Sequence, residues 1–309
     1  MSRLHVVLAQ PRGFCAGVDR AIAIVERALL KFGSPVYVRH EIVHNRRVVE
    51  DLRRKGAIFV DEVDQVPDHA TIIFSAHGVS LQVEAAAKAR PLRVLDATCP
   101  LVSKVHREAS RMDKDGYKVI LIGHQGHPEV VGTVGQLPDG RITVVSNLDH
   151  VTALPDSEEQ RVAYITQTTL SVDETREVVT ALKERFADLR EPGREDICYA
   201  TQNRQNAVKE LAKRCQLVLV LGAPNSSNSN RLREVAQRMG TPAKLIESAA
   251  DVKPEWLDGV SYLGITAGAS APEILVEELL DHLGDRIAEI EYLPQTEENL
   301  AFPLPRELQ

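Results

Sequence analysis

Three of the four cysteines stand in similar sequence contexts, and cysteine thiolates are metal ligands. Cys15 follows Arg-Gly-Phe, Cys99 follows Asp-Ala-Thr and Cys198 follows Asp-Ile, and each precedes a stretch with helical periodicity. At the N-terminus of a helix, the dipole and the free amides lower the pKa of a thiol and favour metal binding. The alternative is three independent buried thiols, because free cysteine is among the most buried residue types. The repeated context favours a shared metal centre.

The fourth cysteine, Cys215, stands in a different context. With Val208 and Leu211 it falls on one face of a predicted helix that leads into the strand Leu217 to Leu221, so we assign it to the core. Three thiolates then remain for the centre. An iron–sulfur cubane held by three cysteines keeps one iron open to a substrate, so such a cluster can be catalytic. The short cysteine spacings typical of zinc sites and ferredoxins do not occur in the sequence.

A second group of polar residues follows predicted strands. His44, His77 and His127 stand in strand-end loops of the first two thirds of the chain, and the last third offers Asn225-Ser226-Ser227-Asn228 and Ser270 at the corresponding places. Imidazoles, hydroxyls, carboxamides and loop amides can bind a phosphate or diphosphate without a Walker lysine. The serine and asparagine string can equally be a turn that caps a helix before Arg231.

Glu129 is a candidate proton donor because it stands two residues after His127 at the same strand end. Thr168, in Thr-Gln-Thr-Thr, could orient its carboxyl group by a hydrogen bond. The alternatives are an exposed glutamate that the dipole favours at a helix start, and threonines that merely end a strand.

The string His40-Glu41-Ile42-Val43-His44 matches the H-E-x-x-H motif of zinc proteases. That motif needs a helix so that both histidines share one face. Here it follows the β-rich run Pro-Val-Tyr-Val-Arg, which places it in a loop between a strand and a helix. A metallopeptidase is therefore a minor alternative.

The elements that must position these residues are those of an α/β protein. Short β-rich runs alternate with stretches of helical period, which is typical of parallel sheets with crossover helices. Apolar residues from Val18 to Phe32 follow one helix face, and Gly33 and Pro35 supply a stop. The predicted strands in the first third of the chain are Leu4 to Leu8, Val36 to Val38, Ala57 to Val60 and Thr71 to Phe74.

A threefold internal repeat organises the chain, because the cysteine segment and two kinds of strand-end loop recur in the same order. Ligands of open α/β sheets bind beyond the carboxyl ends of the strands, so three repeats arranged about an axis would direct these loops into one cavity. We expect repeats at residues 1–97, 98–196 and 197–284. Residues 285–309 contain two prolines after position 300 and no periodicity in their last part, so we expect a tail that packs over the body.

Composition excludes several classes of protein. The 309 residues carry a net charge of -7, which argues against nucleic-acid binding through phosphate neutralisation. Four scattered cysteines are too few for a disulfide scaffold and favour a reducing compartment. The first apolar run is too short for a secretory signal, and no uncharged run is long enough to span a bilayer. We expect a cytoplasmic protein without membrane partners.

Nine strings together resemble the LytB/IspH family, the 4-hydroxy-3-methylbut-2-enyl diphosphate reductases of the non-mevalonate isoprenoid pathway. The resemblance covers nearly the whole chain, and no motif of the family includes Cys215. The strings are PRGFCAGVDRA (11–21), YVRHEIVHN (37–45), SAHGVS (75–80), DATCPLV (96–102), GHQGHPEV (123–130), TQTTLSVD (166–173), DICYATQNRQ (196–205), NSSNSNRL (225–232) and TAGASAP (266–272).

The resemblance implies a trefoil of three similar α/β domains around a four-iron four-sulfur cluster. It implies that Cys15, Cys99 and Cys198 bind the cluster and that Glu129 delivers protons, aided by Thr168 and with His127 in the pocket. It further implies electron delivery by reduced ferredoxin or flavodoxin. The diphosphate would be bound by His44, His77, Ser226, Ser227, Asn228 and Ser270, with His127 and Thr168 also contacting the substrate.

Two hypotheses of other classes remain beside the reductase. One is an iron–sulfur redox sensor, against which the donor groups and Glu129 argue, because a sensor needs neither. The other is a zinc hydrolase that uses three cysteines or the His-Glu-Ile-Val-His string.

Overall fold

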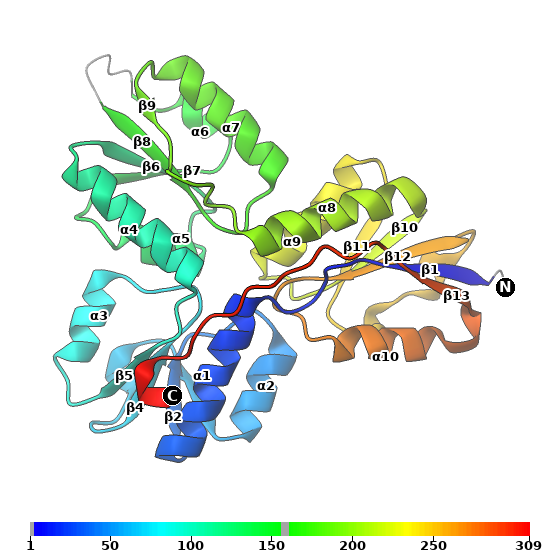
Figure 1. Ribbon diagram of the computed structural model, residues 1–309, viewed down its shortest axis with the longest axis horizontal. Helices are drawn as coiled ribbons and strands as arrows, with labels where there is room; N and C mark the ends of the chain where they lie inside the picture. The colour runs from blue at the N-terminus through cyan, green and yellow to red at the C-terminus, as the bar shows by residue number, and fades with distance from the viewer. Residues whose placement is uncertain (1–2, 156–160) are drawn as a thin grey trace. The chain divides into compact units, whose positions relative to one another are not determined.

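The computed structural model describes residues 3–155 and 161–309, and the strands in these ranges form three sheets in which all paired strands run parallel (Figure 1). The predicted α/β class is confirmed. The four strands predicted in the first third and the helix predicted from Val18 to Phe32 all form, within two residues of the expected bounds. In the described part of the chain, no helix is both long and apolar enough to cross a membrane.

Sheet B comes from the first third of the chain and has the strand order β3-β2-β4-β5. Its strands are β2 (Val36–Arg39), β3 (Ala57–Val60), β4 (Thr71–Phe74) and β5 (Arg93–Asp96). The helices of this segment are α1 (Ala16–Phe32), α2 (Arg46–Arg54) and α3 (Leu81–Lys88).

Sheet C comes from the second third and has the order β7-β6-β8-β9. Apolar clusters cover both of its faces, as expected for a sheet with crossover helices. Its strands are β6 (Lys118–Ile122), β7 (Ile142–Val145), β8 (Val162–Thr166) and β9 (Leu189–Arg190). Its helices are α4 (Pro100–Lys114), α5 (Pro128–Val134), α6 (Leu148–Thr152) and α7 (Val172–Arg185).

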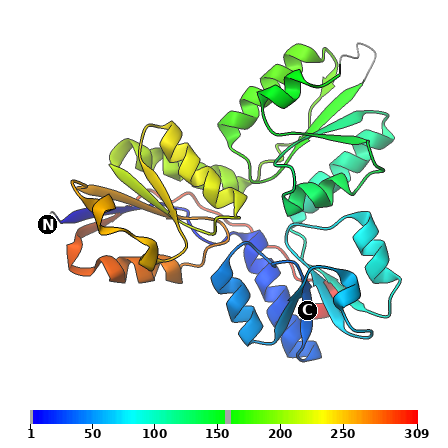
Figure 2. The same cartoon turned by 180° about the vertical axis from the view of Figure 1, so that it is seen from behind.

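Sheet A has the order β11-β10-β12-β1-β13. Leu219 packs on the side of the sheet that α10 covers, whereas Val218 and Val220 pack on the side of α8 and α9 (Figures 1 and 2). Its strands are β1 (Leu4–Leu8), β10 (Leu217–Leu221), β11 (Ala243–Ile246), β12 (Tyr262–Ala267) and β13 (Ile287–Tyr292). Its helices are α8 (Tyr199–Arg214), α9 (Ser227–Arg238) and α10 (Ile274–Leu283).

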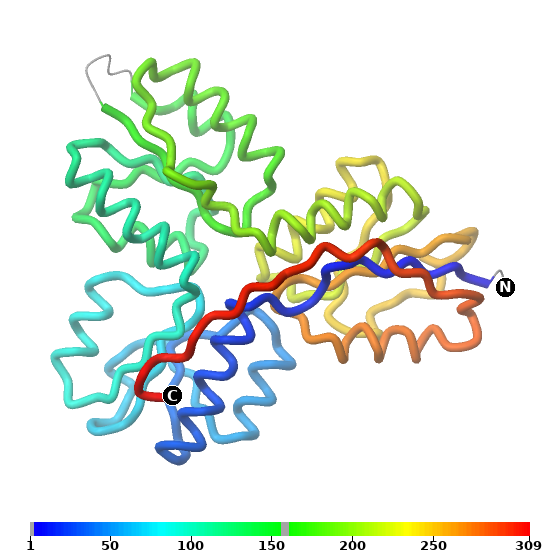
Figure 3. The backbone as a smooth tube through the Cα atoms, in the orientation of Figure 1, coloured from blue at the N-terminus to red at the C-terminus, as the bar shows by residue number. Residues whose placement is uncertain are grey.

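The first and last strands of the chain lie side by side in sheet A. Strand β1 pairs with β12 on one edge and with β13 on the other (Figure 3). Residues 4–8 therefore belong to the sheet of the last third of the chain, which differs from the expected range 1–97 for the first repeat. Likewise residues 287–292 form a strand, so an irregular tail begins only after Tyr292.

Apart from β13, the three sheets share one strand order. Strands β2, β6 and β10 correspond, as do β3, β7 and β11, and β4, β8 and β12. The fourth place is taken by β5, β9 and β1. A threefold repeat is therefore present in the fold, and β1 supplies the strand that the third repeat would otherwise lack.

The chain divides into two compact units. The first unit contains Met1–Val18, His44–Val48 and Tyr199–Leu300, and therefore sheet A. The second unit contains Asp19–Val43, Val49–Cys198 and Ala301–Gln309, and therefore sheets B and C.

Candidate active site

The three repeated cysteines occupy equivalent places in the fold. Each follows the fourth strand of a sheet and directly precedes a helix, namely α1, α4 or α8. Each backbone amide donates a hydrogen bond to the carbonyl that stands two residues beyond the end of the third strand. The bonds are Cys15 to Ala269 (3.4 Å), Cys99 to Ala76 (3.0 Å) and Cys198 to Thr168 (3.0 Å). The local geometry around the cysteines therefore repeats three times.

The chemistry of these thiols suits metal binding. Cys15, Cys99 and Cys198 form no disulfide within the described residues and are partly exposed, and each stands where a helix dipole favours negative charge. Cys215 is buried in the core as predicted, and burial raises the pKa of its thiol to about 11. Within residues 3–155 and 161–309, no three His, Cys, Asp or Glu side chains stand close enough together to hold a single metal ion.

Glu129 is buried rather than exposed at the start of α5, with 3% of its surface accessible. Its Oε1 accepts a hydrogen bond from the backbone N–H of Thr168 at 2.6 Å, and its Oε2 accepts one from Thr168 Oγ1 at 3.0 Å. Burial raises the pKa of Glu129 to about 7, although both bonds from Thr168 lower it, and the charge of Asp196 adds to the rise. A carboxyl group with this pKa carries a proton about half the time at neutral pH, which suits a proton donor.

His127 connects this carboxyl group to sheet B. It caps α5, and its Nδ1 accepts a hydrogen bond from the backbone N–H of Glu129 at 3.2 Å. Its ring lies edge-on to His77, with 5.9 Å between ring centroids. Because His77 follows Ala76, the partner of Cys99, a continuous series of contacts joins four predicted residues to the loops of two cysteines inside the second unit.

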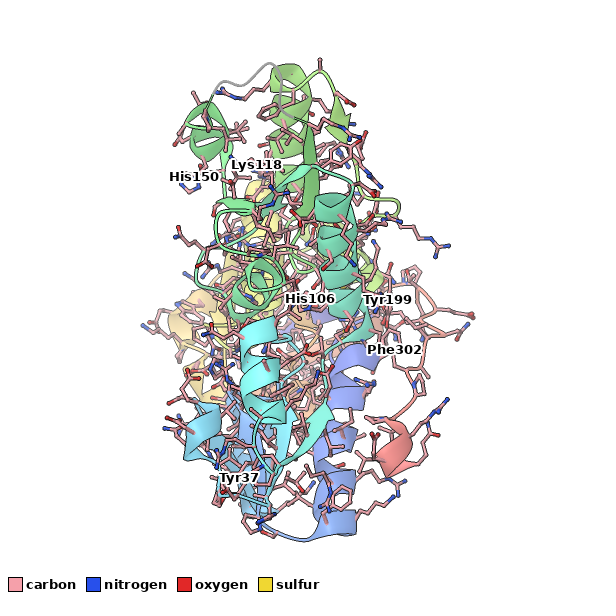
Figure 4. The ribbon with its side chains drawn as sticks, turned by 90° about the vertical axis from the view of Figure 1, so that its left-hand side faces the viewer. Tyr37, His106, Lys118, His150, Tyr199 and Phe302 are labelled. Atoms are coloured by element: carbon pink, nitrogen blue, oxygen red, sulfur yellow. The ribbon has the colours of Figure 1, made fainter. Side chains whose placement is uncertain are left out.

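Glycine makes this arrangement possible at one point. Gly78 follows His77 with a φ of +81°, which side chains rarely tolerate. A Cβ at this position would lie 2.7 Å from Cε1 of His106 on α4. Figure 4 labels His106 on α4 and, apart from it, the exposed His150 on α6, whose Nδ1 accepts a hydrogen bond from Ser146 N–H at 3.2 Å.

The remaining predicted residues gather at the start of α9 in the first unit. Ser270 Oγ donates to the carbonyl of His44 at 3.0 Å, and Asn225 Nδ2 lies 3.3 Å from His44 Nδ1. Ser226 caps α9, and Ser227 is its first residue. Asn228 accepts a bond from Ala269 N–H at 2.8 Å. The carbonyl of the same Ala269 receives the amide of Cys15, so this cluster is tied to the cysteine loop.

The amide nitrogen of Asn228 is a donor without a partner in the described structure. Asn228 is 4% exposed, and its Nδ2 is buried and makes no hydrogen bond. A buried donor without a hydrogen-bond partner destabilises the fold unless a ligand or water accepts its hydrogen bond. Together with two serines at the same helix start, it can bind an anionic ligand.

The string from His40 to His44 lies between β2 and α2 and is not helical. The two histidines therefore do not share a helix face, and the zinc-protease geometry does not form. The structure agrees here with the expectation from the flanking residues.

Sequence reasoning missed a fully buried arginine, Arg204 on α8. Its guanidinium donates to the carbonyls of Gly13 (3.0 Å) and Phe14 (3.1 Å), directly before Cys15. Glu298 accepts from it at 3.0 Å and neutralises it. The position within DICYATQNRQ was a signal, but nothing in the local pattern distinguishes a buried arginine from a solvated one.

It also missed a lysine that joins two cysteine loops. Lys104 on α4 bonds to the carboxylate of Asp196 at 2.8 Å, and the other carboxylate oxygen of Asp196 accepts from Thr166 N–H at 3.0 Å. Asp196 is 4% exposed and precedes Cys198 by two residues. Lys104 with Glu108 had the spacing of an ordinary solvated helix pair, so only the tertiary structure identifies it.

Comparisons with known proteins agree with the resemblance. Residues 6–284 match the family model described as LytB protein. The 4-hydroxy-3-methylbut-2-enyl diphosphate reductase of Magnetococcus marinus is 66% identical over 305 residues, covering 99% of both chains. The enzyme of the same name from Ralstonia nicotianae is 59% identical, covering 99% of this chain and 94% of its own.

Solved structures match as well. The E-1-hydroxy-2-methyl-but-2-enyl-4-diphosphate reductase from Plasmodium falciparum is 36% identical, with a TM-score of 0.96 over 100% of this chain and 97% of its own. A second structure, described as (E)-4-hydroxy-3-methyl-but-2-enyl diphosphate reductase and the terminal enzyme of the non-mevalonate pathway, is 33% identical with a TM-score of 0.65 over 91% of this chain and 99% of its own. This chain therefore belongs to the LytB family of 4-hydroxy-3-methylbut-2-enyl diphosphate reductases.

Proposed function

We propose that this protein reduces 4-hydroxy-3-methylbut-2-enyl diphosphate to isopentenyl and dimethylallyl diphosphate, using a four-iron four-sulfur cluster bound by Cys15, Cys99 and Cys198. The observation that carries the ligand assignment is the hydrogen bond that recurs at all three cysteines. Thiolates at helix starts fit such a cluster, because they are soft donors in a favourable field. When bound, the cluster would supply electrons and a Lewis-acidic iron for the allylic hydroxyl group.

The reaction consumes two electrons and two protons, and it releases water from the allylic hydroxyl group. Hydroxide is a poor leaving group, so the oxygen must gain a proton as its bond to carbon breaks. Glu129 can hold that proton, because burial keeps its pKa near neutrality. Thr168 donates a hydrogen bond to each carboxyl oxygen of Glu129 and so fixes the orientation of the group that carries the proton.

The substrate's diphosphate would be bound by His44, His77, His127 and Thr168 together with the serine and asparagine group. Ser226, Ser227 and Asn228 stand at the N-terminus of α9, where the dipole attracts anions. The unpartnered amide of Asn228 supplies a directed donor there. Ser270 holds the loop of His44 against this group.

Location and electron supply complete the proposal. Reduced ferredoxin or flavodoxin would deliver the electrons one at a time. Partly exposed cysteines that form no disulfide within the described residues suit a reducing compartment, which supports a cytoplasmic location. The shared strand order of the three sheets supports a division into three repeats, with the third completed by β1.

Anaerobic turnover with a chemically reduced dye tests the function. The expected result is oxidation of two equivalents of a one-electron dye for each five-carbon diphosphate formed. Purified protein that shows the full visible spectrum of the cluster but no turnover would contradict the reductase and favour the redox sensor. A colourless protein with stoichiometric zinc would contradict the cluster.

Cysteine variants test the ligands separately. Cys99→Ser should lose most of the visible absorbance, because a hydroxyl group is a poor iron ligand. Cys215→Ser is the matched control and should retain the spectrum, because the side chain lies in the core of sheet A. Equal spectra for both variants would contradict the assignment of Cys99.

A further inference from the structure

An open groove lies on the surface of the second unit beside two of the proposed cluster ligands. One face of α4, from Pro100 to Arg111, forms one wall, and residues 193–195 form the other. Its lining residues are Pro100, Leu101, Lys104, Arg107, Glu108, Arg111, Gly193, Arg194 and Glu195.

The groove is adjacent to both cysteines along the backbone. Pro100 directly follows Cys99, and Glu195 precedes Cys198 by three residues. Electron transfer slows steeply with distance, so a donor must bind where the protein between it and the ligands is thin. Lys104 holds the two walls together, because its ammonium group bonds to the carbonyls of Arg194 (2.7 Å) and Glu195 (3.0 Å).

The charge of the groove is opposite to that of the whole chain. Four lining residues are basic and two are acidic, whereas the chain carries -7. Lys104 is paired with Asp196, and Arg111 with Glu108 at 2.7 Å. Arg107 and Arg194 are exposed and form no ion pair within the described residues, so their charge is available to a partner.

We propose that this groove is the docking site of a small acidic redox protein that delivers the electrons. The proposal rests on the function proposed above. Each product requires two electrons, so a one-electron donor must dock, become oxidised and leave twice. Basic side chains in the same groove as the apolar Pro100 and Leu101 favour fast, reversible docking of an acidic partner, because charge complementarity mainly raises the rate of association.

The test compares two electron sources in the variant Arg107→Glu/Arg194→Glu. With a reduced acidic flavodoxin as the probe, the KM for the donor should rise by about tenfold or more, because two attractive charges become repulsive. With reduced methyl viologen, turnover and the cluster spectrum should match those of the wild type. The wild-type KM for flavodoxin should also rise with salt, and that dependence should weaken in the variant.

The matched control is Arg27→Glu/Lys114→Glu, which changes the net charge equally at exposed positions outside the groove. An equal rise in KM in both variants would show a general charge effect and overturn the docking site. An unchanged KM in the groove variant would overturn it too, as would an equal loss with methyl viologen. If the wild type itself fails with methyl viologen, the proposed reductase function fails instead, so the two failures are distinguishable.

Discussion

Replacing Glu129 by glutamine should abolish turnover and make the protein more stable above neutral pH. Burial raises the pKa of this carboxyl group from 4.5 to about 7 in the folded protein. Between these pH values the folded state binds more protons than the unfolded state, so the free energy of unfolding falls as pH rises. The difference between the two pKa values corresponds to about 3 kcal/mol. Above pH 7 the free energy of unfolding of the wild type is lower by this full amount.

Glutamine removes this penalty and preserves the local geometry. Its carbonyl oxygen can accept from Thr168 N–H, and its amide can donate to Thr168 Oγ1, in place of the bonds of the carboxylate. The variant should therefore be more stable by about 3 kcal/mol at pH 8, but by less than about 1 kcal/mol at pH 5, where Glu129 is protonated in the folded wild type. It should be inactive at both pH values, because an amide donates no proton to the leaving oxygen.

Urea unfolding of the anaerobic protein at pH 5 and pH 8, followed by circular dichroism, measures the difference. Glu184→Gln, at an exposed position on α7, is the matched control and should show a much smaller dependence on pH. A glutamine variant that is less stable than the wild type at pH 8, or that differs equally at both pH values, would refute the reasoning. Retained turnover would remove Glu129 from the mechanism.

Three further predictions concern Thr168, Asn228 and Arg204. Thr168→Val removes a hydrogen bond that lowers the pKa of Glu129, so the pH above which kcat declines should move upward; an unchanged pH profile would show that the hydroxyl group does not act through Glu129. Asn228→Asp replaces a buried donor by an acceptor, so the KM for the diphosphate substrate should rise by about tenfold or more while kcat changes less, and an unaltered KM would exclude this residue from the binding site. Arg204→Met leaves Glu298 without its buried partner and should destabilise the protein by about 3–5 kcal/mol in thermal or urea unfolding. In that background Glu298→Gln should add little, and additive effects of the two changes would show that the pair is not coupled.

Local patterns in the sequence predict the repeated elements well but not the sheets to which they belong. The strand from Leu4 to Leu8 was evident from its composition. Its partners β12 and β13 are more than 250 residues away, and parallel pairing leaves no trace in either segment. The assignment of β1 to sheet A therefore depends on long-range packing that only the structure reveals.

For the candidate site too, local sequence patterns indicate some residues and miss others. Motifs and repeat positions pointed to Cys99 and Glu129, and the structure places Cys99 at the start of α4 and Glu129 buried against Thr168. The supporting charges, Arg204 and Lys104, are missed because their helices have polar positions at ordinary spacing. Their importance comes from burial and from backbone carbonyls far along the chain, to which no local pattern points.

The position of β1 between β12 and β13 in sheet A affects how the protein can fold during synthesis. The first strand to leave the ribosome must wait for β12 and β13, which are synthesised last. The backbone hydrogen bond of Cys15 also forms late, because its acceptor is the carbonyl of Ala269. Contacts between the two ends of a chain form slowly and leave strand edges open in the meantime. A polypeptide whose translation stops before residue 262 therefore lacks β12, β13 and the carbonyl that binds the amide of Cys15, so neither β1 nor this cysteine loop can reach its final structure.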